Sequence, residues 1–261
     1  RRPPRSTQGV SSAASDVYKR QVGPTGEIMQ PIGNLSHQEA VEVFHEQAQG
    51  LKEGGADVIW IETLSSIEEC QAAVKGASVA GLPIVLTLSV ETNGRTMMGV
   101  TPSDLVSLQT DLPVPLIAYG TNCGLGAAEV VAAVINMKQA AELASVEPIL
   151  VAKGNCGIPE WVDGKICYSG TPELMATYTK MAIDSGARII GGCCGASPNH
   201  IAMMRKTIDN YVKSEVPSLE EIERHLGPVT SGAKAQMRGD LSIAGGAAGP
   251  GSKNSRRSRR R

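Results

Sequence analysis

The sequence lacks several patterns that would each indicate a particular class of protein. No apolar run in its 261 residues is long enough to span a membrane, so no membrane partner is expected. No Gly-x-Gly-x-x-Gly motif opens a helix, which disfavours a dinucleotide-binding fold. No Cys-x-x-Cys knuckle is present, which argues against a zinc ribbon. Aromatic residues make up only 3% of the chain, so few rings are available to line a binding site.

Charge is distributed unevenly along the chain. Residues 22–227 carry 12 lysines and arginines against 24 aspartates and glutamates, whereas residues 228–261 carry eight basic residues and one acidic residue. A surface that follows a phosphate backbone needs a basic face. Nucleic acid is therefore not an expected partner of the acidic central region.

The chain contains six unevenly spaced cysteines and no secretory leader. This pattern predicts reduced thiols in a cytoplasmic protein rather than a framework of disulfides. Cys70 falls on a predicted helix and Cys167 in a predicted loop, and both are expected to be chemically inert. The four histidines fall on predicted helices or at their starts, and none is expected to bind a metal.

Composition divides the chain into three segments. Residues 1–21 open with Arg1-Arg-Pro-Pro-Arg5 and show no sustained apolar periodicity, which predicts a disordered, non-native leader. Residues 22–227 have the patterns of a folded domain, and the natural protein is expected to begin upstream of Val22. Residues 228–261 are rich in glycine, small residues and arginine, which predicts a disordered basic tail.

Within 22–227, short apolar runs alternate with helical patterns. A capping box at Ser36 and Glu39 predicts a helix over 36–54, and a further short helix is expected over 218–226. The predicted strands are 57–61, 83–88, 115–119, 148–152 and 187–190. The helices predicted to follow them are 66–80, 102–109, 127–143, 171–185 and 198–212. Such alternation predicts a parallel sheet, either covered on both faces or closed into a barrel.

Polar residues follow each predicted strand, where the active sites of parallel α/β folds gather. They are Glu62-Thr63, Glu91, Asn122-Cys123, Asn155-Cys156 and Cys193-Cys194. Their convergence on one mouth favours a (β/α)8 TIM barrel. Because the sequence holds five repeats and the end of one earlier strand, the predicted fold class is α/β with an incomplete barrel.

Three of the cysteines have the pattern of a metal site. Cys193 and Cys194 lie between glycines after the last strand, and Cys123 holds the equivalent place two strands earlier. Three thiolates with one open position are typical of catalytic zinc, although buried cysteines can also simply pack. Cys156 repeats the Asn-Cys-Gly pattern, but a fourth thiolate would close the site, so we expect Cys156 to pack in the core.

These motifs resemble those of the homocysteine S-methyltransferases, whose zinc is held by an Asn-Cys and a Gly-Gly-Cys-Cys-Gly. The resemblance covers roughly 22–227 and is greatest to the bacterial betaine–homocysteine enzymes. The segments that carry it are 22–27 (VGPTGE), 58–63 (VIWIET), 96–99 (TMMG), 153–159 (KGNCGIP) and 168–175 (YSGTPELM). It implies one Zn²⁺ on Cys123, Cys193 and Cys194, with homocysteine sulfur in the fourth position.

The resemblance also implies a reaction: methyl transfer from betaine to L-homocysteine, giving methionine and dimethylglycine. It assigns Glu62 to the amino group of homocysteine, although a solvated loop carboxylate is the alternative. The family's partner aspartate, in an Asp-Gly motif on the first strand, is absent. Trp161 and Tyr168, in a predicted loop, are candidate donor-side aromatics or loop packing residues.

Relative to that family, the chain is expected to be the carboxyl-terminal two thirds of a barrel, without the first two βα units and most of the third strand. Exposed strand edges then predict low activity and a tendency to aggregate. Two alternatives remain open. The methyl donor could be S-methylmethionine, S-adenosylmethionine or a methyl-corrinoid, or the chain could be a non-catalytic zinc-binding fragment.

Overall fold

The computed structural model describes residues 19–240 and shows six parallel strands in a single curved sheet. The strands lie in the order β1-β2-β3-β4-β5-β8. Their bounds are β1 Lys19–Val22, β2 Val58–Leu64, β3 Ile84–Ser89, β4 Ala118–Cys123, β5 Leu150–Gly154 and β8 Ala187–Gly192. Every neighbouring pair is parallel, so all six carboxyl ends point to the same side.

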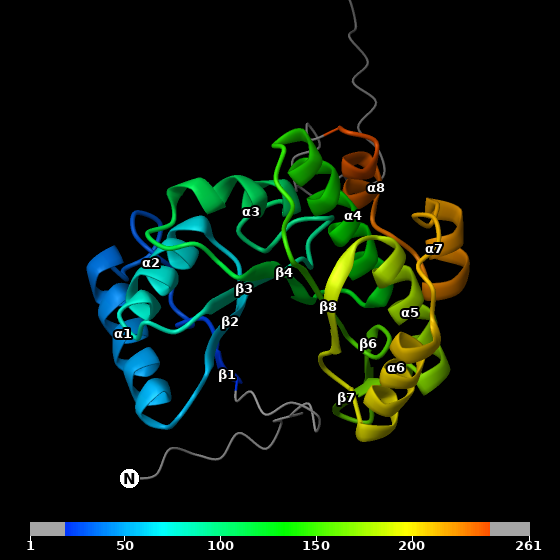
Figure 1. Cartoon of the computed structure of the whole chain (residues 1–261), viewed down its shortest axis with the longest axis horizontal. Helices are drawn as coiled ribbons and strands as arrows, with labels where there is room; N and C mark the ends of the chain where they lie inside the picture. Colours follow the sequence, from blue (N-terminus) through cyan, green and yellow to red (C-terminus); the bar gives the residue numbers. More distant parts are fainter. Residues whose placement is uncertain (1–18, 241–261) are drawn as a thin grey trace, which may run out of the picture.

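Helices cover the outer side of this sheet in an arc (Figure 1). They are α1 His37–Glu53, α2 Ile67–Ser78, α3 Pro102–Leu108, α4 Ala127–Leu143, α5 Pro172–Asp184, α6 Pro198–Asn210, α7 Leu219–Leu226 and α8 Ser231–Met237, with a 3₁₀ turn at Gln109–Asp111. The predicted capping box begins α1, with Ser36 and Glu39 bonded reciprocally. Among the described helices, none combines the length and apolar character needed to cross a bilayer.

Strand–helix alternation around a parallel sheet confirms the predicted fold class, an α/β fold that forms an incomplete (β/α)8 barrel. The sheet is open: within the described residues, β1 and β8 each pair with only one strand. A closed barrel has no such edges. The concave inner side of the sheet is therefore bordered by β1 and β8.

The two faces of the sheet have different cores. Ile59 and Ile61 of β2 face outward into the large core under the helices, whereas Trp60 joins a smaller cluster with Val85, Ala118 and Val151 on the inner face. Side chains alternate between the faces of a strand. Two residues after Trp60 and Val151, the same alternation places the polar side chains of Glu62 and Lys153 on the inner face.

The strands end later than the sequence predicted. Strand β2 continues through Glu62 to Leu64, and β4 runs from Ala118 to Cys123 instead of 115–119. Pro113 and Pro115 have no N–H to donate to a neighbouring strand, which accounts for the late start of β4. Of the polar pairs expected just after the strands, 62–63 and 122–123 therefore belong to the strands themselves, whereas 155–156 and 193–194 follow theirs.

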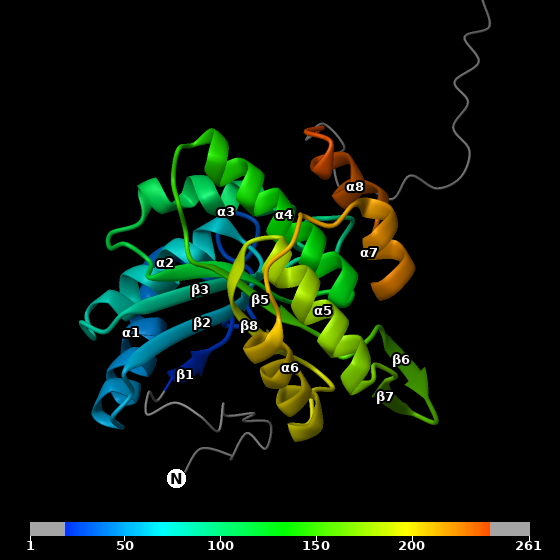
Figure 2. The same ribbon diagram turned by 45° about the vertical axis from the view of Figure 1, so that its right-hand side comes forward.

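A β-hairpin replaces the loop that was predicted around Trp161 and Tyr168. Strands β6 Pro159–Val162 and β7 Lys165–Tyr168 pair antiparallel, apart from the main sheet (Figure 2). Asp163 and Gly164 connect them with φ of 49° and 76°. An Asp-Gly pair with both residues in the left-handed region forms a type I′ turn, which is a recognised hairpin signal.

Two segments outside the predicted domain of 22–227 have regular secondary structure. Residues 19–21 belong to β1, where they pair with β2. Residues 231–237 form α8, because Thr230 caps the helix by accepting from the Ala233 amide. The rest of the predicted leader and tail, residues 1–18 and 241–261, lies outside the described residues.

Polar contacts fix α8 against the loop that follows β3. Asn93 accepts the Gly232 amide at 2.6 Å, and Gln236 donates to the Gly94 carbonyl at 2.8 Å. On the other side, Asn136 of α4 donates to Gln236 at 3.3 Å. A segment distant in sequence thus holds a loop at the carboxyl end of the sheet.

Candidate metal and substrate site

Three cysteines converge at the carboxyl ends of β4 and β8. Cys123 is the last residue of β4, and Cys193 and Cys194 directly follow β8. Strand β5 separates β4 from β8 in the sheet. The structure thus brings together the three cysteines that the sequence predicted to be metal ligands.

The three sulfur atoms form a compact group. All lie within 4.8 Å of one another, with the Cys123 Sγ 2.6 Å from Cys193 Sγ and 3.8 Å from Cys194 Sγ. Two sulfurs on a tetrahedral zinc at about 2.3 Å each lie about 3.8 Å apart. Three such thiols suit a soft or borderline metal ion, so the three cysteines can bind a metal.

The backbone around these cysteines depends on residues with positive φ. Cys123 has φ of 55° and Gly124 has φ of 67°, which turns the chain sharply after β4. A Cβ at Gly124 would lie 2.3 Å from the Val90 carbonyl oxygen, and one at Gly195 would lie 2.5 Å from Cγ of Tyr168. Both glycines are therefore needed for close packing at the site, in agreement with their place in the motifs.

Asn155 connects the two ligand segments. Its amide nitrogen donates to the Gly124 carbonyl at 3.0 Å, and its oxygen accepts the Cys194 amide at 3.1 Å. Cys156, the next residue, is fully buried in the core and donates its amide to the Cys194 carbonyl. The second Asn-Cys-Gly sequence thus supports the three grouped cysteines from behind, in the way that outer hydrogen bonds orient the ligands of metal sites.

Asn122 connects three strand ends beneath Cys123. Its side-chain oxygen accepts the Thr63 amide at 3.0 Å and the Thr87 hydroxyl at 2.6 Å, while its nitrogen donates to the Thr63 hydroxyl at 2.9 Å. The residue is fully buried. Asn122 therefore fixes Thr63, and with it the neighbouring Glu62, relative to Cys123.

Protons are shared unequally among the three thiols. Hydrogen bonds with Cys193 and Cys194 raise the pKa of Cys123 far above its usual range. The hydrogen bond with Cys123 lowers the pKa of Cys193, but the bond with Cys194 and burial outweigh it, so that pKa is raised. Hydrogen bonds with Cys123 and Cys193 lower the pKa of Cys194 to about 2, with a smaller contribution from the Tyr168 hydroxyl. Of the three thiols, Cys194 thus has the lowest pKa.

In the metal-free protein, Cys194 should react with iodoacetamide over a wider pH range than an ordinary cysteine. Its pKa is lowered, so the thiolate present above the usual pKa of about 8.5 persists as the pH falls through that value. We expect its labelling rate to change little between pH 8 and pH 5, whereas an ordinary thiol slows about tenfold per pH unit. Mass spectrometry of the labelled peptide gives the rate. A tenfold decline per pH unit at Cys194 would contradict the assignment.

Glu62 lies at the same mouth, on the inner face at the end of β2. Its carboxylate forms an ion pair with Lys153 of β5, and the two side chains are 17% and 8% exposed. The Lys153 ammonium also lies 5.3 Å from the centroid of the Trp60 ring. Glu62 was predicted from the sequence, whereas Lys153 was not.

The two candidate donor-side aromatics occupy different environments. Tyr168 is packed against the core, and its hydroxyl contributes to the lowered pKa of Cys194, which places it at the cysteine group. Trp161 is 73% exposed on β6. Of the remaining cysteines, Cys70 is buried in α2 and Cys167 is exposed on β7, so neither belongs to the group.

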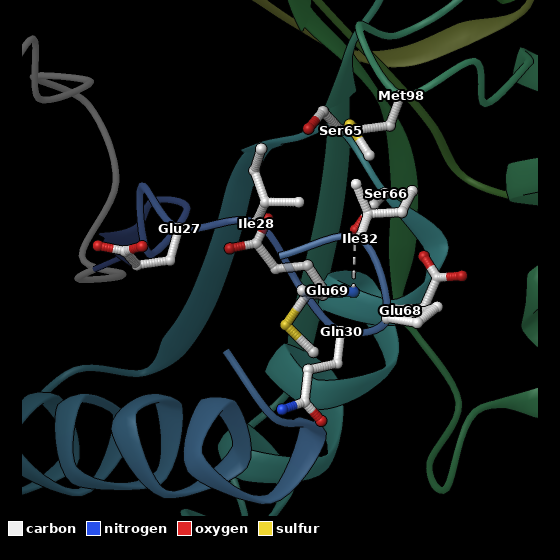
Figure 3. A pocket seen from close by; sticks show the side chains of 11 residues that line it. Glu27, Ile28, Gln30, Ile32, Ser65, Ser66, Glu68, Glu69 and Met98 are labelled. Atoms are coloured by element: carbon white, nitrogen blue, oxygen red, sulfur yellow. Dashed lines mark hydrogen bonds between the residues drawn. The ribbon is translucent and has the colours of Figure 1, made fainter. Parts of the chain in front are cut away.

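A small separate cavity of about 90 Å³ lies between the loop before α1 and the start of α2 (Figure 3). Its lining includes Glu27, Ile28, Glu68 and Met98, and none of the three grouped cysteines. Figure 3 also shows the Ser66 hydroxyl accepting the Glu69 amide, at 3.2 Å, which caps α2. The cavity thus lies at the start of α2, apart from the three grouped cysteines.

Comparison with known proteins identifies relatives of this architecture. Residues 7–208 match the family model described as homocysteine S-methyltransferase. The chain is similar to the apo form of the homocysteine methyltransferase MmuM from Escherichia coli, with 24% identity, a TM-score of 0.56, and coverage of 73% of this chain and 63% of that one. For the metallated form of MmuM the values are 23%, 0.50, 66% and 52%. The chain thus spans less than two thirds of the length of either solved structure, and the likeness to them shows the fold.

Proposed function

Because the chain belongs to the homocysteine S-methyltransferase family, as its motifs predicted, we propose that it acts in zinc-dependent methyl transfer from betaine to L-homocysteine. The products are methionine and dimethylglycine. Cys123, Cys193 and Cys194 would hold one zinc ion and leave its fourth position to the thiol substrate. The observation that carries the proposal is the group of three sulfurs within 4.8 Å at the mouth of the sheet.

Zinc, when bound, supplies the Lewis acidity that keeps a coordinating thiol deprotonated near neutral pH. The protein's own residues hold the zinc-binding segments in place and orient them. Asn155 and Asn122 fix the ligand segments through hydrogen bonds to Gly124, Cys194 and Thr63. Such positioning lowers the entropic cost of bringing a sulfur and a methyl group into line.

The reaction itself needs no general base from the chain once the thiol has lost its proton. A new sulfur–carbon bond forms while the carbon–nitrogen bond of the donor breaks, and the electron pair of that bond leaves with the amine. The positive charge of the quaternary nitrogen is lost in this step. What remains for the protein is recognition of the two substrates.

Glu62 is the proposed contact for the amino group of homocysteine. Its carboxylate lies on the inner face beside the cysteine mouth, where Asn122 holds the adjacent Thr63. A charge-assisted hydrogen bond to a carboxylate contributes about 1.5–3 kcal/mol. Glu62 already pairs with one ammonium group, that of Lys153, which is consistent with its binding the ammonium group of a ligand.

Methyl transfer by the zinc-loaded chain tests the proposal. Purified protein should form methionine from homocysteine and betaine faster than a protein-free control. Parallel reactions with S-methylmethionine, S-adenosylmethionine and a methyl-corrinoid would identify the donor. The variant Glu62→Gln should weaken homocysteine binding about 10- to 100-fold, the equivalent of the lost charge-assisted bond, while zinc content stays the same.

Two results would count against this function. Zinc retention without methyl transfer from any of the four donors would favour a non-catalytic zinc-binding role. Faster transfer from another donor than from betaine would move the chain to a different branch of the same family. The reduced thiols required by the site are those expected of a cytoplasmic protein.

A further inference from the structure

Lys153 is a buried cation that the proposed chemistry does not use. Its side chain is 8% exposed, it pairs with the carboxylate of Glu62, and its ammonium lies over the ring of Trp60. Removing two ions from water is costly unless their pairing is close. A lysine kept in this position, at the mouth of the sheet, therefore needs an explanation.

The ion pair crosses the inner face of the sheet rather than joining neighbouring strands. Glu62 is on β2 and Lys153 on β5, with β3 and β4 between them. Gly120 lies two residues after Ala118 on the same face of β4, between Thr87 of β3 and Val151 of β5, and has no side chain to obstruct the crossing. On the other flank, a Cβ at Gly191 would lie only 3.4 Å from Cγ of Lys153. The long side chain of Lys153 thus reaches Glu62 across the inner face of β3 and β4.

The partner of Lys153 is the carboxylate assigned to the substrate's amino group. In the free protein, an alkylammonium group already occupies Glu62. When the ammonium of a substrate binds there, the site holds two cations and only one carboxylate. A second negative charge would then replace the carboxylate that Lys153 has lost as its ion-pair partner, which is favourable because an unpaired buried charge is costly. An amino acid brings that charge with it.

We propose that Lys153 binds the α-carboxylate of the amino-acid thiol while Glu62 binds its ammonium group. This inference rests on the proposed function. In the free protein the two side chains neutralise each other, and the zwitterionic end of the substrate inserts between them. Lys153 is then a specificity-determining residue, because only a ligand with both charges gives Glu62 and Lys153 an ion-pair partner each.

The selectivity can be measured by calorimetry on the zinc-loaded protein with three thiols. They are L-homocysteine, 3-aminopropane-1-thiol, which is homocysteine without its carboxylate, and 1-propanethiol, which lacks both charges. Wild-type protein should prefer homocysteine to the aminothiol by about 10- to 100-fold, the range for one charge-assisted bond. Lys153→Met should lose that preference without weaker binding of 1-propanethiol. Lys153→Arg should retain it.

Lys165→Met is the matched control, because Lys165 is an exposed lysine on β7. It should bind all three thiols as the wild type does. Trp60 gives an independent readout: with Trp161→Phe as background, Trp60 is the only tryptophan. Homocysteine should change its emission as the ammonium of Lys153 turns away, whereas 1-propanethiol should not.

Equal weakening of all three thiols by Lys153→Met would assign the residue a purely structural role and overturn the inference. An unchanged ratio of homocysteine to aminothiol affinity would do the same. If 1-propanethiol binds the wild type in either case, the zinc site works and only the role of Lys153 fails. If neither 1-propanethiol nor homocysteine binds, the proposed function fails with it.

Discussion

Under the proposed function, replacing Cys123 with serine should remove most of the chain's affinity for zinc and abolish methyl transfer. Cys123 supplies one of three sulfurs in the group and contacts both of the others. A structural zinc site yields about 10–16 kcal/mol, or roughly 3 kcal/mol for each ligand, so affinity should fall at least a hundredfold. Competition with a chromogenic chelator measures the change.

Cys167→Ser is the matched control for this experiment. Cys167 is an exposed cysteine on β7, outside the group, and its replacement should leave both zinc affinity and the melting temperature unchanged. Equal zinc affinity in Cys123→Ser and the wild type would mean that the ion is held elsewhere in the chain. The assignment of the metal site would then be wrong.

Replacing Asn122 with alanine will destabilise the fold by about 3–5 kcal/mol. The change leaves the Thr63 amide and the Thr87 hydroxyl without an acceptor, because both donate to the Asn122 oxygen. Each buried donor left without a partner costs about 1–3 kcal/mol, and the loss of packed atoms adds to this. Thermal unfolding followed by circular dichroism should show a melting temperature about 10 °C lower.

Asn136→Ala separates this effect from the general cost of losing a buried asparagine. Asn136 is 3% exposed in α4, but in the described part of the chain its side chain makes one hydrogen bond, a 3.3 Å contact with Gln236. About 1 kcal/mol of destabilisation is expected for the loss of one such bond. If both variants unfold at the same temperature, Asn122 has no special role in joining the strand ends.

The strands and the convergence of the three cysteines could be predicted because both depend on local pattern. Runs such as Ile84–Ser89 are apolar and rich in β-branched residues, and helices with clear caps follow them. Parallel strands place all their carboxyl ends on one side, so cysteines at the ends of β4 and β8 had to lie close together. No distance information was needed for that inference.

The supporting residues could not be predicted, because their roles depend on tertiary contacts. Asn122 and Asn155 each begin an Asn-Cys-Gly sequence. Asn122 joins strand ends, whereas Asn155 joins the turns that carry the grouped cysteines. The pair of Lys153 and Glu62 spans two intervening strands, a reach set by side-chain length and curvature of the sheet. No spacing rule along the chain encodes such a contact.

The hairpin around Trp161 was missed although a signal was present. The Asp163-Gly164 pair between two short β-prone runs indicates a type I′ turn. The sequence of α8 indicates a helix less clearly than 163–164 indicates a turn, because its seven residues are mostly small and polar. It forms where α4 and the loop after β3 supply partners for it. Packing thus decides a segment that local propensity leaves open.

The attachment of α8 has a consequence for the way the fold opens locally. The Gly232 amide is held by Asn93, and the Gly94 carbonyl by Gln236, so neither segment can detach without breaking the other's hydrogen bonds. The helix and the loop after β3 therefore form one cooperative unit, with a common opening free energy and linked amide exchange. That loop also carries Glu91 at the mouth of the sheet. Local opening of α8 would therefore release the segment around Glu91 at the same time.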